Sequence, residues 1–129
     1  MTDQFIAYET AKTMRELGFN EPCFFCYRED SPGKVNLYNA TDGPEGYSNE
    51  EGIDVAAPTY QQAFEWFRKE YGMLHAIVPN RGDFLYFYGH TFFRGSMGTV
   101  TGTFVEYREA EKECLRKLIE DAEALKSIT

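Results

Sequence analysis

The stretch that most constrains the fold is residues 58–72, because it contains the start, the face and the end of one helix. Pro58 cannot continue a helix backward, and Thr59 with Gln62 forms a capping-box pair. Gly72 can supply the left-handed residue that ends the helix. Aromatic side chains recur on one stripe of this helix: Tyr60, Phe64, Phe67 and Tyr71. We therefore expect a sheet to cover this stripe and the remaining elements to pack around it.

The rest of the chain predicts strands in runs that are separated by helices. We expect further helices at residues 5–17 and 107–125, and strands at residues 22–29, 34–38, 75–78, 83–89 and 99–106. The order α-β-β-α-β-β-β-α indicates an α+β fold, a single domain over residues 1–129 with a mainly antiparallel sheet. The strand at 83–89 is apolar on both faces, which predicts a central strand that is covered on both sides.

Three local features sharpen these predictions. Residues 30–33 have the composition of a turn, and we expect a hairpin loop slightly longer than the tightest types. Glu113 and Lys117 have the spacing of a favourable helical ion pair. The last helix has a core stripe whose members are apolar: Ala110, Cys114, Leu115, Leu118, Ile119, Ala122 and Leu125.

The segment at residues 39–57 differs from its surroundings because it is rich in glycine and acidic residues. A loop of this length inside a compact domain is either functional or mobile, and its composition favours a mobile acidic loop. Ile53 and Val55 are compatible with a short edge strand that leads into the central helix.

The formal net charge of -8 disfavours direct binding to nucleic acid, which requires a basic face. An acidic surface is typical of plain solubility, and it is also compatible with a decoy that mimics nucleic acid and inhibits a nucleic-acid enzyme. The chain has three cysteines, and its first residues have neither a signal peptide nor a membrane span. We expect a cytoplasmic protein with reduced thiols and no membrane association.

Three pieces of the chain together suggest a resemblance. They are Gly18-Phe19 followed by Pro22-Cys23, the stretch from Pro58 to Arg68, and residues 107–119 from Tyr107-Arg108-Glu109 to Leu118-Ile119. In this order they resemble small uncharacterised proteins carried by phages and prophages of gut Bacteroides-type bacteria. The resemblance covers about half of the chain by our reading of these helix caps and core stripes. It implies a bacterial or phage origin and implies no activity and no functional residues.

Chemistry-bearing residues are few. Cys23 and Cys26 form a C-x-x-C pattern, but an offset of three within a strand places the two side chains on opposite faces, so we expect structural burial. His75, His90 and Cys114 could serve a small enzyme as acid, base or nucleophile, although each stands alone in the sequence. We expect no cofactor and no metal, because no ligands have paired spacing.

The leading hypothesis is a non-enzymatic accessory protein of phage or mobile-element type that acts through protein contacts. Trp66 lies away from the centre of the aromatic stripe, so it either packs at the rim of the core or serves as an interface anchor. We assign partner binding to Trp66 and to the loop acids Glu50, Glu51 and Asp54. Homodimerisation is compatible with the sequence. The acidic decoy and the small enzyme remain as alternatives.

Overall fold

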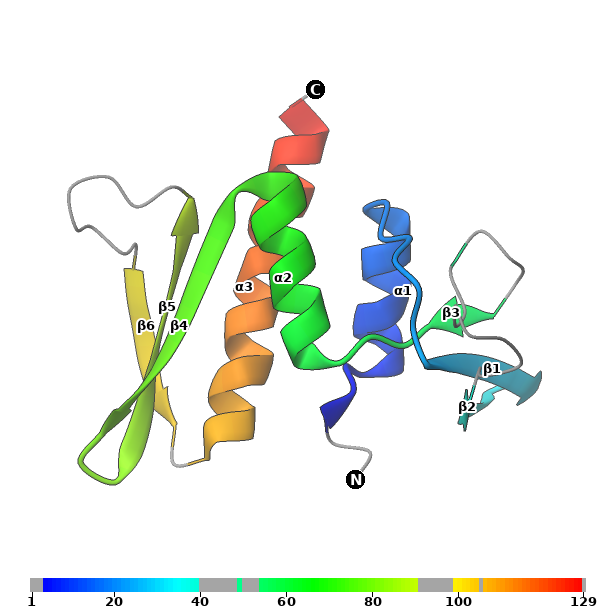
Figure 1. Ribbon diagram of the computed structural model, residues 1–129, viewed down its shortest axis with the longest axis horizontal. Coiled ribbons are helices and arrows are strands. Elements are labelled where there is room, and N and C mark those ends of the chain that lie inside the picture. The colour runs from blue at the N-terminus through cyan, green and yellow to red at the C-terminus, as the bar shows by residue number, and fades with distance from the viewer. Residues whose placement is uncertain (1–3, 40–48, 50–53, 91–98, 105, 129) are drawn as a thin grey trace. The chain divides into compact units, whose positions relative to one another are not determined.

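The computed structural model describes residues 4–39, 49, 54–90, 99–104 and 106–128, and Figure 1 shows their arrangement. The elements are α1 (Tyr8–Glu16), β1 (Phe25–Ser31), β2 (Lys34–Asn39), β3 (Val55–Ala56), α2 (Tyr60–Tyr71), β4 (Met73–Asn80), β5 (Asp83–His90), β6 (Thr99–Phe104) and α3 (Tyr107–Ile128). The predicted α+β class and element order are confirmed, with β3 as a short additional strand before α2.

The chain divides into two compact units, which we call unit 1 (Met1–Thr59) and unit 2 (Tyr60–Thr129). Each unit has its own antiparallel sheet of three strands, in the orders β2-β1-β3 and β4-β5-β6. The strands therefore form two sheets, where the sequence predicted one. The prediction of a single folding domain stays a prediction.

In unit 1, α1 begins at Tyr8, three residues later than predicted, because the chain before it is extended. Phe5 forms an antiparallel bridge with Thr59, and the Ile6 backbone N–H donates to the Pro58 carbonyl at 3.1 Å. The helix ends as predicted at Gly18, which has a φ of +107°. The N–H groups of Gly18 and Phe19 donate back to the carbonyls of Arg15 and Met14, at 3.0 and 2.9 Å, which is the bonding pattern of a Schellman motif.

The β1–β2 hairpin is tighter than predicted. Ser31 pairs with Lys34, so only Pro32 and Gly33 form the loop, and Gly33 has a φ of +81°. Proline followed by a left-handed glycine is typical of a type II turn. The expected longer loop is wrong because the register shifts between Glu29 and Ser31, which absorbs one residue in a bulge instead.

β3 pairs with β1 where the core of unit 1 lies. Cys26 pairs with Ala56 and Tyr27 with Val55, and the Ala57 N–H donates to the Phe25 carbonyl at 2.9 Å. The described end of the segment predicted as a mobile loop is therefore ordered, since Val55, Ala56 and Ala57 are buried. Most of that segment, residues 40–48 and 50–53, lies outside the described residues.

In unit 2, α2 carries the predicted aromatic stripe and begins and ends within two residues of the prediction. Tyr60, Phe64 and Phe67 are buried, Tyr71 is half-buried, and Gly72 has a φ of +67° after the last turn. The sheet of unit 2 meets this stripe through His75 of β4, whose ring stacks on Phe64 at a centroid distance of 3.6 Å. The predicted contact between a sheet and the stripe is confirmed at Phe64, while Tyr60 lies against Arg108 of α3.

β5 is the central strand of its sheet, as predicted. Its face with Phe84, Tyr86 and Tyr88 is the helix side, since Tyr86 is fully buried and Phe84 contacts Tyr107 of α3 edge-on. Figure 1 shows α2 and α3 on this same side of the sheet. On the opposite face, Leu85 is only half-buried and its neighbouring strand exposes Val78 by 41%, so the described residues of unit 2 do not cover both faces equally.

α3 buries six of its seven predicted core residues, while Leu125 is 41% exposed because the helix continues past the core. The predicted pair of Glu113 with Lys117 is replaced by an ion pair with Arg116, which also contacts Glu120 at 3.0 Å. Within the part of the chain that the structure describes, no helix has the length and apolar character needed to span a bilayer.

Candidate binding site

Unit 1 contains a pocket of about 650 Å³ alongside β1. Three of its residues, Arg28, Glu29 and Asp30, lie beyond Tyr27, the last β1 residue that pairs with β3. The pocket is therefore built where β1 continues past its short neighbour. The side chains that line it are Tyr8, Tyr27, Arg28, Glu29, Asp30, Asp54 and Val55.

Two tyrosines form the aromatic wall of this pocket. Tyr27 donates its hydroxyl to the Ile6 carbonyl at 2.5 Å, and its ring meets Tyr8 of α1 edge-on at a centroid distance of 5.5 Å. Partial burial raises the pKa of Tyr27, so this phenol stays protonated near neutral pH. The hydrogen bond fixes the Tyr27 ring and gives the pocket a preformed wall.

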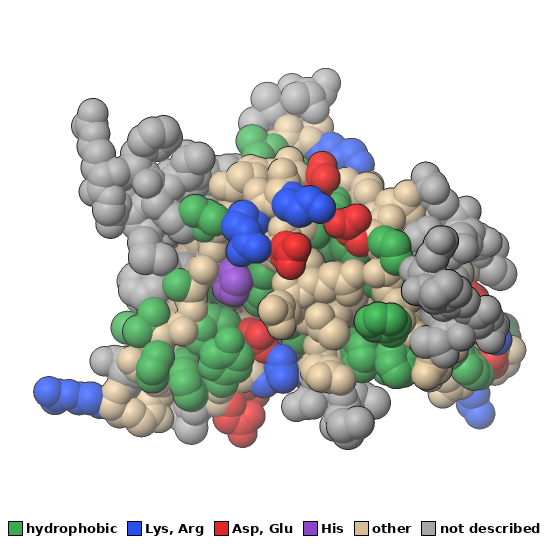
Figure 2. All heavy atoms as spheres, viewed as in Figure 1, with side chains coloured by type: hydrophobic (Ala, Val, Ile, Leu, Met, Phe, Trp, Pro, Cys, Tyr) green, Lys and Arg blue, Asp and Glu red, His purple; other side chains and the backbone are tan. Residues whose placement is uncertain are grey.

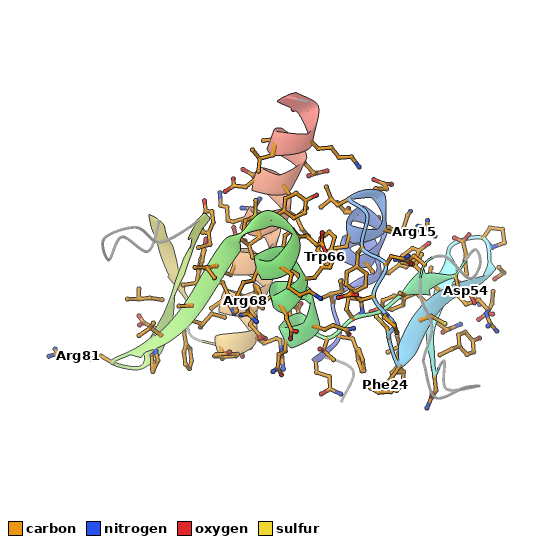
Figure 3. The ribbon with its side chains drawn as sticks, turned by 45° about the horizontal axis from the view of Figure 1, so that its top comes forward. Arg15, Phe24, Asp54, Trp66, Arg68 and Arg81 are labelled. Carbon is orange, nitrogen blue, oxygen red and sulfur yellow. The ribbon has the colours of Figure 1, made fainter. Side chains whose placement is uncertain are left out.

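Arg28 and Asp54 form the main charged contact of the pocket. The Nε and Nη2 atoms of Arg28 each lie 3.1 Å from Asp54 Oδ2, and the guanidinium also lies 4.8 Å from the centre of the Tyr38 ring. The hydrogen bond with Asp54 raises the pKa of Arg28, which keeps it charged. Figure 3 labels Asp54 at its place in unit 1, where its side chain is 18% exposed.

Asp30 and Glu29 add two further carboxylates to the lining. Asp30 accepts a short hydrogen bond from the Tyr38 hydroxyl and another from Asn36 Nδ2 at 2.7 Å, and these bonds lower its pKa. Glu29 accepts from the Gly33 N–H at 3.4 Å. With one guanidinium and three carboxylates, the lining has a formal charge of -2 (+1 - 3).

Of the predicted partner-binding residues, the structure describes Asp54 in unit 1 and Trp66 in unit 2. Asp54 lines the pocket, whereas Glu50 and Glu51 lie outside the described residues. Trp66 is only 5% exposed on α2, and its ring contacts Phe67 and Tyr71 edge-on at 5.0 and 5.6 Å. This burial fits the rim-packing alternative for Trp66 and argues against an exposed anchor.

The residues proposed for a small enzyme are poorly placed for catalysis where they are described. Burial, with a contribution from Arg68, lowers the pKa of His75 to about 4, so the ring is neutral at physiological pH. Cys114 is completely buried, and burial with the nearby carboxylates of Glu111 and Glu113 raises its pKa to about 12. The side chain of His90 lies outside the described residues. Because its pKa is raised and it is buried, the Cys114 thiol is a weak nucleophile at pH 7.

Cys23 and Cys26 are both buried free thiols, as the sequence predicted. Cys23 contacts the Glu21 carbonyl at 3.5 Å, and burial raises the pKa of Cys26. Over the described ranges, no group of three or more histidine, cysteine or carboxylate side chains has the geometry to hold a metal ion.

Acidic and basic side chains alternate on α3. Arg116 binds both Glu113 and Glu120, and Arg108 binds Glu111, so these carboxylates do not form a surface of one sign. Figure 2 shows basic and acidic side chains lying next to one another on the face it presents. The decoy interpretation requires acids gathered on one face, and α3 does not supply such a face.

Most of the pocket was missed by the sequence analysis, which singled out only Asp54. Strand alternation places Arg28 and Asp30 on one face of β1, and this signal was available. The contribution of Tyr8 depends on α1 packing beside the sheet, which no local pattern reveals.

Comparisons of the chain with protein-family models, curated proteins and solved structures found no match.

Proposed function

We propose that the chain is a non-enzymatic accessory protein of the phage or mobile-element type, and that it binds a protein partner through unit 1. The observation that carries this proposal is the pocket beside β1, whose two tyrosines and one arginine are residue types enriched at protein interfaces. The phage-type origin rests on the sequence resemblance alone.

Two exposed side chains of unit 1 support a role in contacts. Phe24, labelled in Figure 3, precedes β1 and is 69% exposed, the highest exposure among the described large apolar side chains. Arg28 presents a charged group whose position is fixed by Asp54 and Tyr38. Side chains already held in place lose little entropy on binding, which favours a specific contact.

The burial of Cys114 and the neutral state of His75 favour this proposal over the small enzyme. An enzyme based on these residues would need them accessible to substrate and able to exchange protons near neutral pH. The mixed charges of α3 likewise favour the accessory protein over the acidic decoy.

The test is affinity purification of the tagged full chain from its own kind of cell, followed by mass spectrometry. We expect a protein recovered in stoichiometric amount with the wild type and lost with a double variant, Tyr8→Ala combined with Phe24→Ala, which removes part of the aromatic wall of the pocket and an exposed ring of unit 1. The matched control is Glu65→Gln, which changes an exposed side chain of α2 in unit 2 and should retain the partner.

Recovery of the intact tagged protein without any stoichiometric partner would contradict the proposal. Recovery of a partner that is retained by the double variant would place the contact elsewhere and contradict the assignment to unit 1. Size-exclusion chromatography with light scattering on the same samples tests the homodimer that the sequence allows.

A further inference from the structure

The pocket of unit 1 has a chemical preference that the proposed function leaves open. Its lining combines two tyrosine rings with three carboxylates and a single guanidinium. That guanidinium is engaged by Asp54 and by the face of Tyr38, so it neutralises at most one of the three acids. The remaining charge favours a positively charged group.

The tyrosines around the pocket already accept cations from their own chain. The Lys12 ammonium lies 5.2 Å from the centre of the Tyr8 ring, and the Arg28 guanidinium lies 4.8 Å from that of Tyr38. Aromatic faces attract cations through the ring quadrupole, and nearby carboxylates add to this attraction. Both contacts show that this neighbourhood stabilises positive charge beside aromatic rings.

The dimensions and burial of the pocket also limit the ligand. A volume of about 650 Å³ exceeds what one amino-acid side chain fills, so the pocket can take a side chain with part of its backbone. Glu29 and Asp30 are exposed at one end, while Val55 is buried at the other. An aliphatic stem that ends in a cation suits a cavity with both kinds of wall.

We infer that this pocket receives a cationic side chain, an arginine or lysine, from the protein partner. This inference rests on the proposed function and adds the chemistry by which the partner is recognised. The stem of the incoming side chain packs on Tyr27 and Val55, and its charged end reaches the exposed end of the pocket, where the carboxylate of Glu29 lies nearest and Asp30 adds its negative charge. The partner then presents a basic segment to an acidic chain with net charge -8.

The test uses blocked amino acids as probes and amide chemical shifts of the full chain as the readout. N-acetyl-arginine N-methylamide and N-acetyl-lysine N-methylamide should cause saturable shifts at residues 27–30 and 54–55. N-acetyl-citrulline N-methylamide has the shape of the arginine probe without its charge, and it should cause at most weak shifts. Raising the salt concentration should weaken binding of both charged probes, because the carboxylates are exposed.

Glu29→Gln removes one charge and keeps an acceptor for the Gly33 N–H, so the hairpin should stay intact. We expect this variant to weaken the arginine probe by about 3-fold, and Glu65→Gln in unit 2 to leave it unchanged. Equal shifts from arginine and citrulline, shifts that do not saturate, or equal affinities of the Glu29 and Glu65 variants would overturn the inference. If a partner is captured through unit 1 while the probes fail, the inference falls and the proposed function stands.

Discussion

Among the described residues, most of the large aromatic side chains of unit 2 are buried, whereas most of those of unit 1 are only half-buried and Phe24 is exposed. Tyr60, Phe64, Trp66, Phe67 and Tyr86 are all buried in unit 2. Among the aromatic side chains that the structure describes in unit 1, only Phe19 is buried, and the core there consists largely of smaller or flexible side chains. Aromatic rings supply stability when they are buried and contact energy when they are exposed.

The charged groups of the two units differ in the same way. In unit 2, Arg108 binds Glu111, which is only 7% exposed, and the guanidinium also lies 5.2 Å from the Tyr60 ring centre. In unit 1, Arg28 is half-exposed beside an open pocket. The contacts of Arg108 thus link α3 to α2 inside unit 2, whereas those of Arg28 with Asp54 and Tyr38 lie at the surface of unit 1.

The largest expected effect comes from truncating one ring in each unit. Phe67→Ala removes a fully buried ring and should lower the free energy of unfolding by about 4 kcal/mol, through lost burial and the cavity left behind. Phe24→Ala is the same change at an exposed position and should alter the free energy of unfolding by less than about 0.5 kcal/mol. Urea titrations compare the two, and similar losses would remove the contrast between the units.

The pH dependence of stability provides a second test in unit 2. The pKa of His75 is lowered to about 4 from an ordinary 6.5, so the folded chain holds this ring neutral while the unfolded chain protonates it between these values. Its contribution is fully present above pH 6.5 and is lost as the pH falls toward 4. Because the ring is partly exposed, we expect a loss of about 2 kcal/mol over that range.

His75→Phe keeps a ring against Phe64 and cannot be protonated, so it isolates this contribution. Urea midpoints measured at pH 7, 5.5 and 4.5 should fall less steeply for the variant than for the wild type. Parallel profiles would mean that His75 is accessible to protons in the folded state.

Removing one guanidinium from each unit compares their ion pairs. Arg108→Gln leaves the buried carboxylate of Glu111 without its charged partner and should cost about 1.5 kcal/mol. Arg28→Gln affects a pair at the surface and should leave the urea midpoint within the error of the measurement. A larger loss for Arg28→Gln would indicate that unit 1 depends on this pair for folding.

The smallest expected effect concerns the end of α1. Gly18 has a φ of +107°, and an added Cβ would meet no atom within 4 Å, so Gly18→Ala introduces backbone strain and no clash. We expect a loss of about 1 kcal/mol in the free energy of unfolding. Asparagine tolerates positive φ better, so Gly18→Asn should lose less, and an equal loss in both variants would argue against strain as the cause.

Regular elements with strong local signals could be predicted from the sequence. The aromatic stripe of α2 and the glycine after it fixed that helix, and the alternation in residues 83–89 identified the central strand. The division into two sheets could not be predicted, because strand partners are chosen by packing between distant segments. The pocket could not be predicted for the same reason, because Tyr8 and Asp54 lie beside β1 only in the folded structure.

Trp66 illustrates the limit of pattern analysis. Its position on the helical wheel allowed either burial or exposure, and the edge contacts with Phe67 and Tyr71 that accompany its burial depend on side-chain conformations. Helical periodicity gives the direction of a side chain and does not give what lies in that direction.

The central claim is that a protein partner binds at the unit 1 pocket, and hydrogen exchange of the complex tests it most directly. The full chain is mixed with the captured partner, and amide exchange is compared with that of the chain alone. We predict slower exchange at residues 27–30 of β1 and around Tyr8 of α1, with the amides of α3 unchanged. Slower exchange confined to unit 2, with β1 unaffected, would contradict the account.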